Sequence, residues 1–305
     1  MKKSMRTKTI GVMAAGMVLT ASLGAAAYAN GNAYDNFRDA AIKTAENDNS
    51  TLTSNIEIRQ NGAVTASGRL NVQSAGEESY SSGQFKIGGK TLDVEQSTED
   101  GKVILRKGSE YYSLDAQPQD LQEKPFESSP SAERLMEAAS DLLLGDIKKS
   151  FTESGDTITL DLTDAQIPEL ANLAMNAMLE AGAQRGEEAL AGEAQWHSDS
   201  EWADFDQASL LPIKSDGRIE RVRLEATLAN GAIATLKATI GVSGLDADGQ
   251  KTEAEASIDS AFSQIGSTVP QDIDVTGQTV KPLELPEGAE HGRFGHGPFG
   301  PDRSE

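Results

Sequence analysis

The side chains that could bind a metal ion gather in one acidic stretch of the chain. Five of them lie within ten residues: His197, Asp199, Glu201, Asp204 and Asp206. Carboxylate oxygens at this density are typical of calcium sites, but the ligand spacing of a calcium loop and its central glycine are absent. We therefore interpret residues 187–206 as a solvated acidic insertion and predict no metal site there.

Two further groupings carry metal-ligand side chains. The segment Asp246-Ala247-Asp248-Gly249 has two carboxylates, yet it fits a hairpin turn better than a metal loop. His291 and His296 lie in a Gly/Pro-rich tail, residues 286–305, which we expect to be disordered. Two histidines in such a tail fall short of the ligand set of a zinc site, so the sequence predicts no bound metal.

Recognised catalytic motifs are missing from the sequence. It contains no Gly-x-Ser-x-Gly, no His-Glu-x-x-His, no phosphate-binding loop and no cysteine. A pair of carboxylates can hydrolyse a glycoside, but 48 acidic residues give no means of choosing one pair. We therefore predict that the protein is not an enzyme and has no catalytic residues and no cofactor.

The N-terminal segment has the features of a secretory signal. Four basic residues accompany an apolar run over residues 10–23, and Ala27-Tyr28-Ala29 places small residues at a cleavage position. We expect cleavage after Ala29 and a secreted protein, extracellular or associated with the cell surface, with an uncleaved anchor as the alternative. No cysteine is present at the predicted cut to carry a lipid, so we expect no stable membrane anchor.

The charge of the chain narrows the class of partner. The formal net charge is −21, and it becomes −25 once the four basic residues of residues 1–29 are removed. Such a charge repels the phosphates of nucleic acid, so we predict no nucleic-acid partner. Because disulfides are also excluded by the absence of cysteine, the core must supply the stability of the fold.

Turn signals separate short alternating segments in the first part of the chain. Residues 34–46 predict an amphipathic helix, and turns follow at Asn61-Gly62, Gly88-Gly89 and Lys107-Gly108. Each turn joins two segments in which apolar and polar residues alternate, as in a half-buried strand. The pattern predicts a meander of about six antiparallel strands.

Helices and longer strands are expected in the rest of the chain. A helix should run from Ser129 or Ser131 to about Gly145, and residues 157–163 alternate as a strand. Three long antiparallel strands follow, with turns at Asn230-Gly231 and at residues 246–249.

Residues 164–182 predict a third helix that is apolar over most of its surface. After its first turn, its polar side chains form one thin stripe, which we expect to face solvent: Glu169, Asn172, Asn176 and Glu180. A sheet must then cover the rest of the helix. The predicted fold class is α+β, a large curved antiparallel sheet (half-barrel) wrapping two or three helices in a single domain over residues 30–285.

This order of elements resembles the LolA and LppX type of fold over roughly residues 34–280. The segments that carry the likeness are "YDNFRDAAIKTAENDNSTLTSNIEIRQNG", "DLLLGDIKKSFTESGDTITLDLTDAQIPELANLAM" and "RVRLEATLANG", through which the chain also resembles uncharacterised secreted proteins of spore-forming bacteria. The resemblance implies a half-barrel that holds acyl chains between its sheet and its helices. It implies no role for any single residue.

The candidate ligand-binding residues follow from this arrangement. They are the apolar residues of the third helix and of two long strands: Leu170, Leu173, Met175, Met178, Leu179, Leu224, Leu228, Leu236 and Ile240. Methionines suit an adaptable acyl pocket, although the same residues can also close a solid core. We expect a secreted binding protein for a lipid or other apolar small molecule. The alternative is a structural or interaction protein of the cell surface, with a filled core and a cell-wall component as partner.

Overall fold

A computed structural model describes residues 32–115, 147–177, 179 and 212–282 of the chain. Four predictions lie outside these residues: the signal peptide at 1–29, the helix near 129–145, the acidic insertion at 187–206 and the tail at 286–305. Among the described helices, none is long and apolar enough to cross a membrane.

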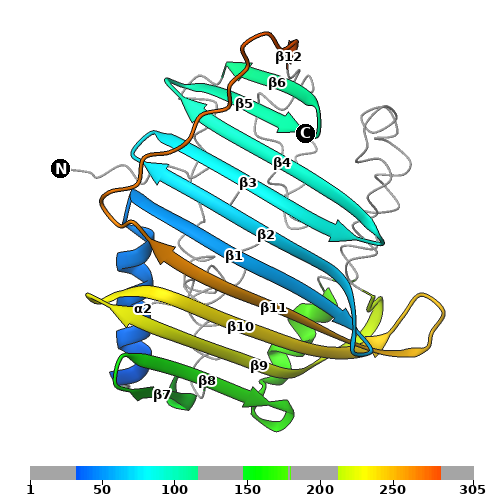
Figure 1. The fold of residues 1–305 in the computed structure, drawn as a ribbon. Coiled ribbons are helices and arrows are strands. Elements are labelled where there is room, and N and C mark those ends of the chain that lie inside the picture. The colour runs from blue at the N-terminus through cyan, green and yellow to red at the C-terminus, as the bar shows by residue number, and fades with distance from the viewer. Residues whose placement is uncertain (1–31, 116–146, 178, 180–211, 283–305) are drawn as a thin grey trace, which may run out of the picture.

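One open sheet dominates the molecule (Figure 1). It has twelve strands in the order β12-β6-β5-β4-β3-β2-β1-β11-β10-β9-β8-β7. Their bounds are β1 Asn49–Gln60, β2 Ala63–Ala75, β3 Glu78–Ile87, β4 Lys90–Glu99, β5 Lys102–Lys107, β6 Glu110–Asp115, β7 Phe151–Ser154, β8 Thr157–Thr163, β9 Ser215–Ala229, β10 Ala232–Leu245, β11 Lys251–Ser263 and β12 Val280–Pro282.

The prediction of a large sheet carrying helices is confirmed, but its description as an antiparallel α+β fold needs correction. The described residues are mainly β, and the sheet is mixed because β12 pairs in parallel with β6. All other neighbouring strands are antiparallel. A strand of three residues has no periodicity that a sequence pattern could reveal, so β12 was not predicted.

The predicted hairpins are confirmed, and their turns explain why. Asn61 and Gly62 have φ values of 49° and 82°, and Asn230 and Gly231 have 53° and 72°. Positive φ at both central residues defines the type I′ turn, whose twist matches that of the two strands. These turns fix the β1–β2 and β9–β10 hairpins.

Pairing of β1 with β11 joins the two meanders into one sheet. The register runs from Thr51 opposite Ser263 to Gln60 opposite Ala254. Residues about 200 positions apart in the sequence thus lie side by side. The two faces of the combined sheet differ in chemistry. We call the face that carries Leu224 and Leu236 the helix face, and the opposite one the polar face.

The helix face is covered at the β7–β10 end by α2, Asn32–Ala45. Phe37 is 1% exposed, and the rings of Tyr34 and Phe151 meet edge to face with centroids 5.3 Å apart. The Thr44 hydroxyl accepts a hydrogen bond from the Ile233 N–H at 2.8 Å. The core that results contains the buried residues Phe37, Ala40, Ala41, Ile158, Leu160, Leu162, Ile167, Leu224, Ala226, Ile233 and Leu236.

A second helix covers residues 169–177 and 179, and we call it the Asn helix. It begins five residues later than predicted, because Asp164–Gln166 forms a separate 3₁₀ turn. Pro168 lies just before the helix, where its missing N–H breaks no helical bond, and its carbonyl accepts the first bond, from the Ala171 N–H at 2.9 Å.

The Asn helix differs from its predicted orientation, because the asparagines of its polar stripe face the sheet. Asn172 is 9% exposed, whereas Leu173 is 58% exposed. The Asn172 amide oxygen accepts a bond from the Ile219 N–H at 2.9 Å. The Asn176 amide accepts from the Gly217 N–H at 2.8 Å and donates to the Gly217 carbonyl at 2.7 Å. These two asparagines face β9, whereas Glu169 of the same stripe is exposed and Glu180 lies outside the described residues. The asparagines face β9 because β8 ends its pairing at Thr163 opposite Arg221, and the β9 backbone beyond needs other partners.

A C-terminal strap, residues 264–282, crosses from β11 to the far edge of the sheet (Figure 1). Ile273 packs with Tyr80 and Ile104 on the polar face. The Gln271 N–H donates to the Gln73 side chain at 2.9 Å. At its end β12 pairs with β6, so the strap ties β1–β6 together.

Candidate functional site

The residues predicted to line an apolar pocket are dispersed. Leu224 and Leu236 are 6% and 3% exposed, and they lie in the core with Phe37 and Ile158. Half-buried positions are taken by Leu170, Met175, Leu179, Leu228 and Ile240. Leu173 lies at the surface, and Met178 is outside the described residues.

The Asn helix lies directly against the backbone of β9. A Cβ atom built on Gly217 would be 2.8 Å from the Met175 Cε and 2.9 Å from the Leu179 Cδ1. Contacts this close require the absence of a side chain on Gly217. The helix and the strand therefore meet here without space for an acyl chain between them.

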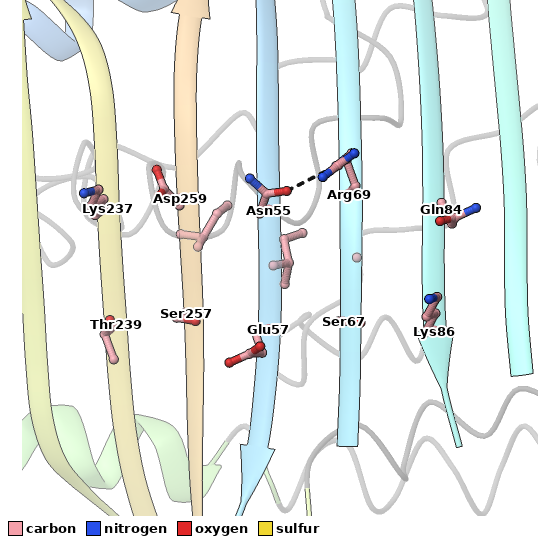
Figure 2. Close-up of a pocket in the computed structure, with 13 residues that line it drawn as sticks. Asn55, Glu57, Ser67, Arg69, Gln84, Lys86, Lys237, Thr239, Ser257 and Asp259 are labelled. Atoms are coloured by element: carbon pink, nitrogen blue, oxygen red, sulfur yellow. Dashed lines mark hydrogen bonds between the residues drawn. The ribbon is translucent and has the colours of Figure 1, made fainter. Parts of the chain in front are cut away.

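A groove of about 620 Å³ lies on the opposite, polar face of the sheet. It crosses five neighbouring strands, β3, β2, β1, β11 and β10 (Figure 2). Ten of its lining residues point outward from this face in two rows. The first row is Gln84, Arg69, Asn55, Asp259 and Lys237, and the second is Lys86, Ser67, Glu57, Ser257 and Thr239.

Strand register produces both rows. In the first, Asn55 lies opposite both Arg69 and Asp259, and Asp259 lies opposite Lys237. In the second, Glu57 lies between two serines, Ser67 and Ser257. Neighbouring strands are about 4.8 Å apart, so each row is about 19 Å long.

Some of the polar groups in the groove are bonded to the protein and others are not. The Gln84 side chain donates to the Asp93 carboxylate at 2.8 Å. Arg69 Nε donates to the Asn55 amide oxygen at 3.3 Å (Figure 2). Glu57 accepts from Arg59 at 2.7 Å, outside the groove. Within the described part of the chain, the side chains of Lys86, Lys237 and Asp259 form no hydrogen bond or ion pair. These groups remain available to a ligand.

The charges of the groove nearly balance. Three cations and two carboxylates line it: Arg69, Lys86, Lys237, Glu57 and Asp259. The full chain carries −21, so this region is locally far less acidic than the average surface. Arg69, Lys86, Lys237 and Asp259 are exposed, which leaves their charged ends in water.

Two carboxylates elsewhere on the sheet have pKa values lowered by ion pairs. A hydrogen bond from Arg221 lowers the pKa of Asp161, and bonds from Lys281 and Tyr112 lower the pKa of Glu110. Both carboxylates lie on the surface in contact with cations. We interpret them as members of surface ion pairs and not as groups that transfer protons. Neither carboxylate lines the groove.

No described group of three or more histidine or acidic side chains has a geometry that could hold a metal ion. The predicted turn at residues 246–249 is confirmed as a turn. The Asp246 carboxylate accepts bonds from the N–H groups of Asp248 and Gln250, both at 2.9 Å. This carboxylate is thus occupied by the backbone of its own turn.

The groove was missed by sequence reasoning because its residues have no motif. Each occupies the polar position of an alternating strand, and such positions are usually only solvated. The two halves of the groove come together through the pairing of β1 with β11, which local hairpin signals do not determine. The alternation of apolar and polar residues places Asn55 and Glu57 on one face of the strand. Which residues of other strands lie beside them is known only from the pairing of those strands.

Comparison with known proteins gives no family for the chain. No protein-family model and no characterised protein matches it. Among solved structures, "Crystal structure of an N-terminal dehydratase from difficidin assembly line" aligns with 84% of this chain and 86% of that chain at 13% identity, with a TM-score of 0.14. A score this low does not establish a shared fold.

Proposed function

We propose that the protein is a non-enzymatic binding protein of the cell exterior that meets a hydrophilic partner through the polar face of its sheet. One observation carries this proposal. A groove in the middle of that face presents charged groups, and three of them, Lys86, Lys237 and Asp259, have no bonding partner among the described residues. Unpaired polar groups that remain in water lose little on binding a partner that supplies hydrogen bonds.

The packing on the other face supports the same choice. Leu224 and Leu236, which were expected to contact an acyl chain, contact core side chains instead. Met175 and Leu179 lie against Gly217. These contacts favour the filled core of an interaction protein over an acyl pocket at this position.

Co-sedimentation with purified peptidoglycan sacculi tests the proposal. The full chain, secreted from a bacterial host, should pellet with sacculi at low salt. Part of the binding should be lost as salt rises, because exposed charges such as those of Arg69 and Lys86 are screened. A protein that stays in the supernatant at every salt concentration would contradict a role at the cell surface.

A lipid carrier is the second candidate, and a different part of the helix face favours it. Apolar side chains continue there across β1–β4, beyond the region that α2 covers. In the row through Ile56, the neighbouring positions are Gly68, Phe85 and Leu92. A curved half-barrel of the LolA and LppX type would hold acyl chains on this face.

Native mass spectrometry of the secreted protein separates the two candidates. Discrete adducts of lipid mass that disappear on solvent extraction would establish a carrier. A bare mass, together with no uptake of added phospholipid, would eliminate the carrier and leave the interaction protein.

A further inference from the structure

We propose that the polar groove binds a polyhydroxylated chain, a glycan, laid across the strands. This inference rests on the proposed function and names the class of partner for the same site. It follows from the two rows of side chains, Gln84 to Lys237 and Lys86 to Thr239, which the register places side by side.

The row geometry matches a chain of sugar units. Successive side chains in a row are separated by the distance between strands, about 4.8 Å. This distance is close to the length of one pyranose unit. A glycan lying along the groove would therefore present one sugar to each strand, and about four or five sugars would fill its length of about 19 Å.

The side chains supply the hydrogen bonds that sugar hydroxyls need. A hydroxyl is both donor and acceptor, so its best partners are planar groups with defined donors and acceptors. The first row provides the guanidinium of Arg69 and the amide of Asn55, which share one bond and keep other donors and acceptors. It also provides the amide of Gln84, which donates to Asp93, and the unbonded carboxylate of Asp259. Alternation of donors and acceptors lets neighbouring hydroxyls bond in sequence.

Other partners fit the groove less well. Nucleic acid is repelled by a net charge of −21, and the groove holds only one more cation than carboxylates. Protein interfaces are anchored by buried aromatic and arginine side chains, but no aromatic residue lines the groove and its one arginine, Arg69, is exposed. An acyl chain would bury the charges of Lys86 and Asp259 without partners.

The binding of soluble oligosaccharides to the full chain tests this inference. The probes are hexamers and trimers of N-acetylglucosamine and of galacturonic acid, titrated by calorimetry at low salt. We expect at least one hexamer to bind, and to bind more tightly than its trimer because the groove spans five strands. Binding of the galacturonate hexamer alone would assign recognition to the cations of the groove.

Variants locate the binding on the molecule. Arg69→Ala and Asp259→Ala should each weaken hexamer binding about tenfold, the loss expected for one charge-assisted hydrogen bond. Arg223→Ala is the matched control, since Arg223 lies on the same face but does not line the groove. All three residues are exposed, so circular dichroism should show an unchanged fold.

The results of these experiments distinguish a failure of glycan binding in the groove from a failure of the proposed cell-surface function. Hexamer binding that Arg69→Ala leaves unchanged would overturn the groove as the site. Binding to sacculi without binding to any oligosaccharide would overturn the glycan and keep the interaction protein. If the protein binds neither sacculi nor oligosaccharides, both proposals are wrong.

Discussion

Asn176 takes the place of a neighbouring strand for part of β9. Its amide donates to the Gly217 carbonyl and accepts from the Gly217 N–H, as the backbone of a paired strand would. The same amide nitrogen donates to the Asn172 carbonyl at 2.8 Å within the helix. One side chain therefore fixes the helix on the sheet and completes the bonding of the β9 backbone at Gly217.

Asn176→Ala should destabilise the protein by about 1–3 kcal/mol, because it leaves half-buried backbone groups of β9 without partners. Urea unfolding followed by circular dichroism measures the change. Leu173→Ala is the control on the same helix. Since Leu173 is 58% exposed, its change should stay within about 0.5 kcal/mol. A larger loss of stability for Leu173→Ala than for Asn176→Ala would instead support the predicted orientation, in which the polar stripe faces solvent.

Phe85 lies flat over two glycines on the helix face. A Cβ atom at Gly68 would be 2.5 Å from the Phe85 ring, and one at Gly83 would be 2.6 Å from it. Gly68→Ala should therefore cost about 1–3 kcal/mol through overpacking. Adding Phe85→Leu should recover part of that cost in a double-mutant cycle. Simple additivity of the two changes would show that the ring can move away freely.

Residue types alone predicted a helix in this region, but they did not predict its first residue or which of its side chains face the sheet. A stripe of two asparagines and two glutamates is typical of a solvated face, and hydrophobicity favoured burying Leu173 instead. The deciding factor was the demand of the β9 backbone for hydrogen bonds, which exists only once β8 has ended. That demand is a property of the assembled sheet.

Among the elements of the fold, the strap depends most on contacts with residues that are distant in the sequence. It begins after β11, crosses the polar face near Tyr80 and ends as β12 beside β6. The Ser97 hydroxyl donates to the Asp272 carboxylate at 3.0 Å, and Thr268 is bonded to Asn49 at 2.7 Å. These contacts hold strands that are distant in the sheet order to one segment of chain.

Ile273→Ala should destabilise the protein by about 2–5 kcal/mol, because Ile273 is 6% exposed in a cluster with Tyr80 and Ile104. Urea unfolding gives the global loss, and limited proteolysis reports release of the strap alone. Val269→Ala, at an 82% exposed position of the same strap, should change stability by less than about 0.5 kcal/mol. Equal effects of the two substitutions would mean that the cluster does not hold the strap.

A carboxylate contact gives the strap a pH dependence. The negative charge of Asp272 raises the pKa of Glu99 above its ordinary value of 4.5. Above the folded pKa both groups are ionised and repel, and the repulsion disappears as pH falls through that pKa. Glu99→Gln should therefore raise Tm slightly at pH 7 and leave it unchanged well below pH 4.5. Thermal scans across this range measure the difference, and a lower Tm at pH 7 would contradict it.

The sequence predicted those elements that have a turn or periodicity pattern of their own. It did not predict the short strands that exist only through pairing with another strand. The hairpin turns and α2 have sequence patterns of their own. In contrast, β7 and β12 are four and three residues long, and each is defined only by the strand beside it. The 3₁₀ turn at Asp164–Gln166 lies where the sequence pattern predicts the start of the Asn helix, because the same capping residues can precede a 3₁₀ turn or an α-helix.

At the scale of the whole molecule, one sheet separates two kinds of chemistry. The helix face is packed against α2 and the Asn helix around Leu224 and Leu236. The polar face is free of these helices and carries the groove between β3 and β10. The alternation of apolar and polar residues predicted that the faces differ. The chemical use of the polar face became visible only with the register between β1 and β11.

The most direct test of binding by the polar face uses the absence of cysteine in the chain. Ser67→Cys introduces a single thiol in the groove, and Ser82→Cys introduces one on the same face outside it. Rates of maleimide labelling should be measured with and without peptidoglycan sacculi. Slower labelling at the first position, with no change at the second, is the result we predict. Equal rates at the groove position with and without bound sacculi would contradict binding through this face.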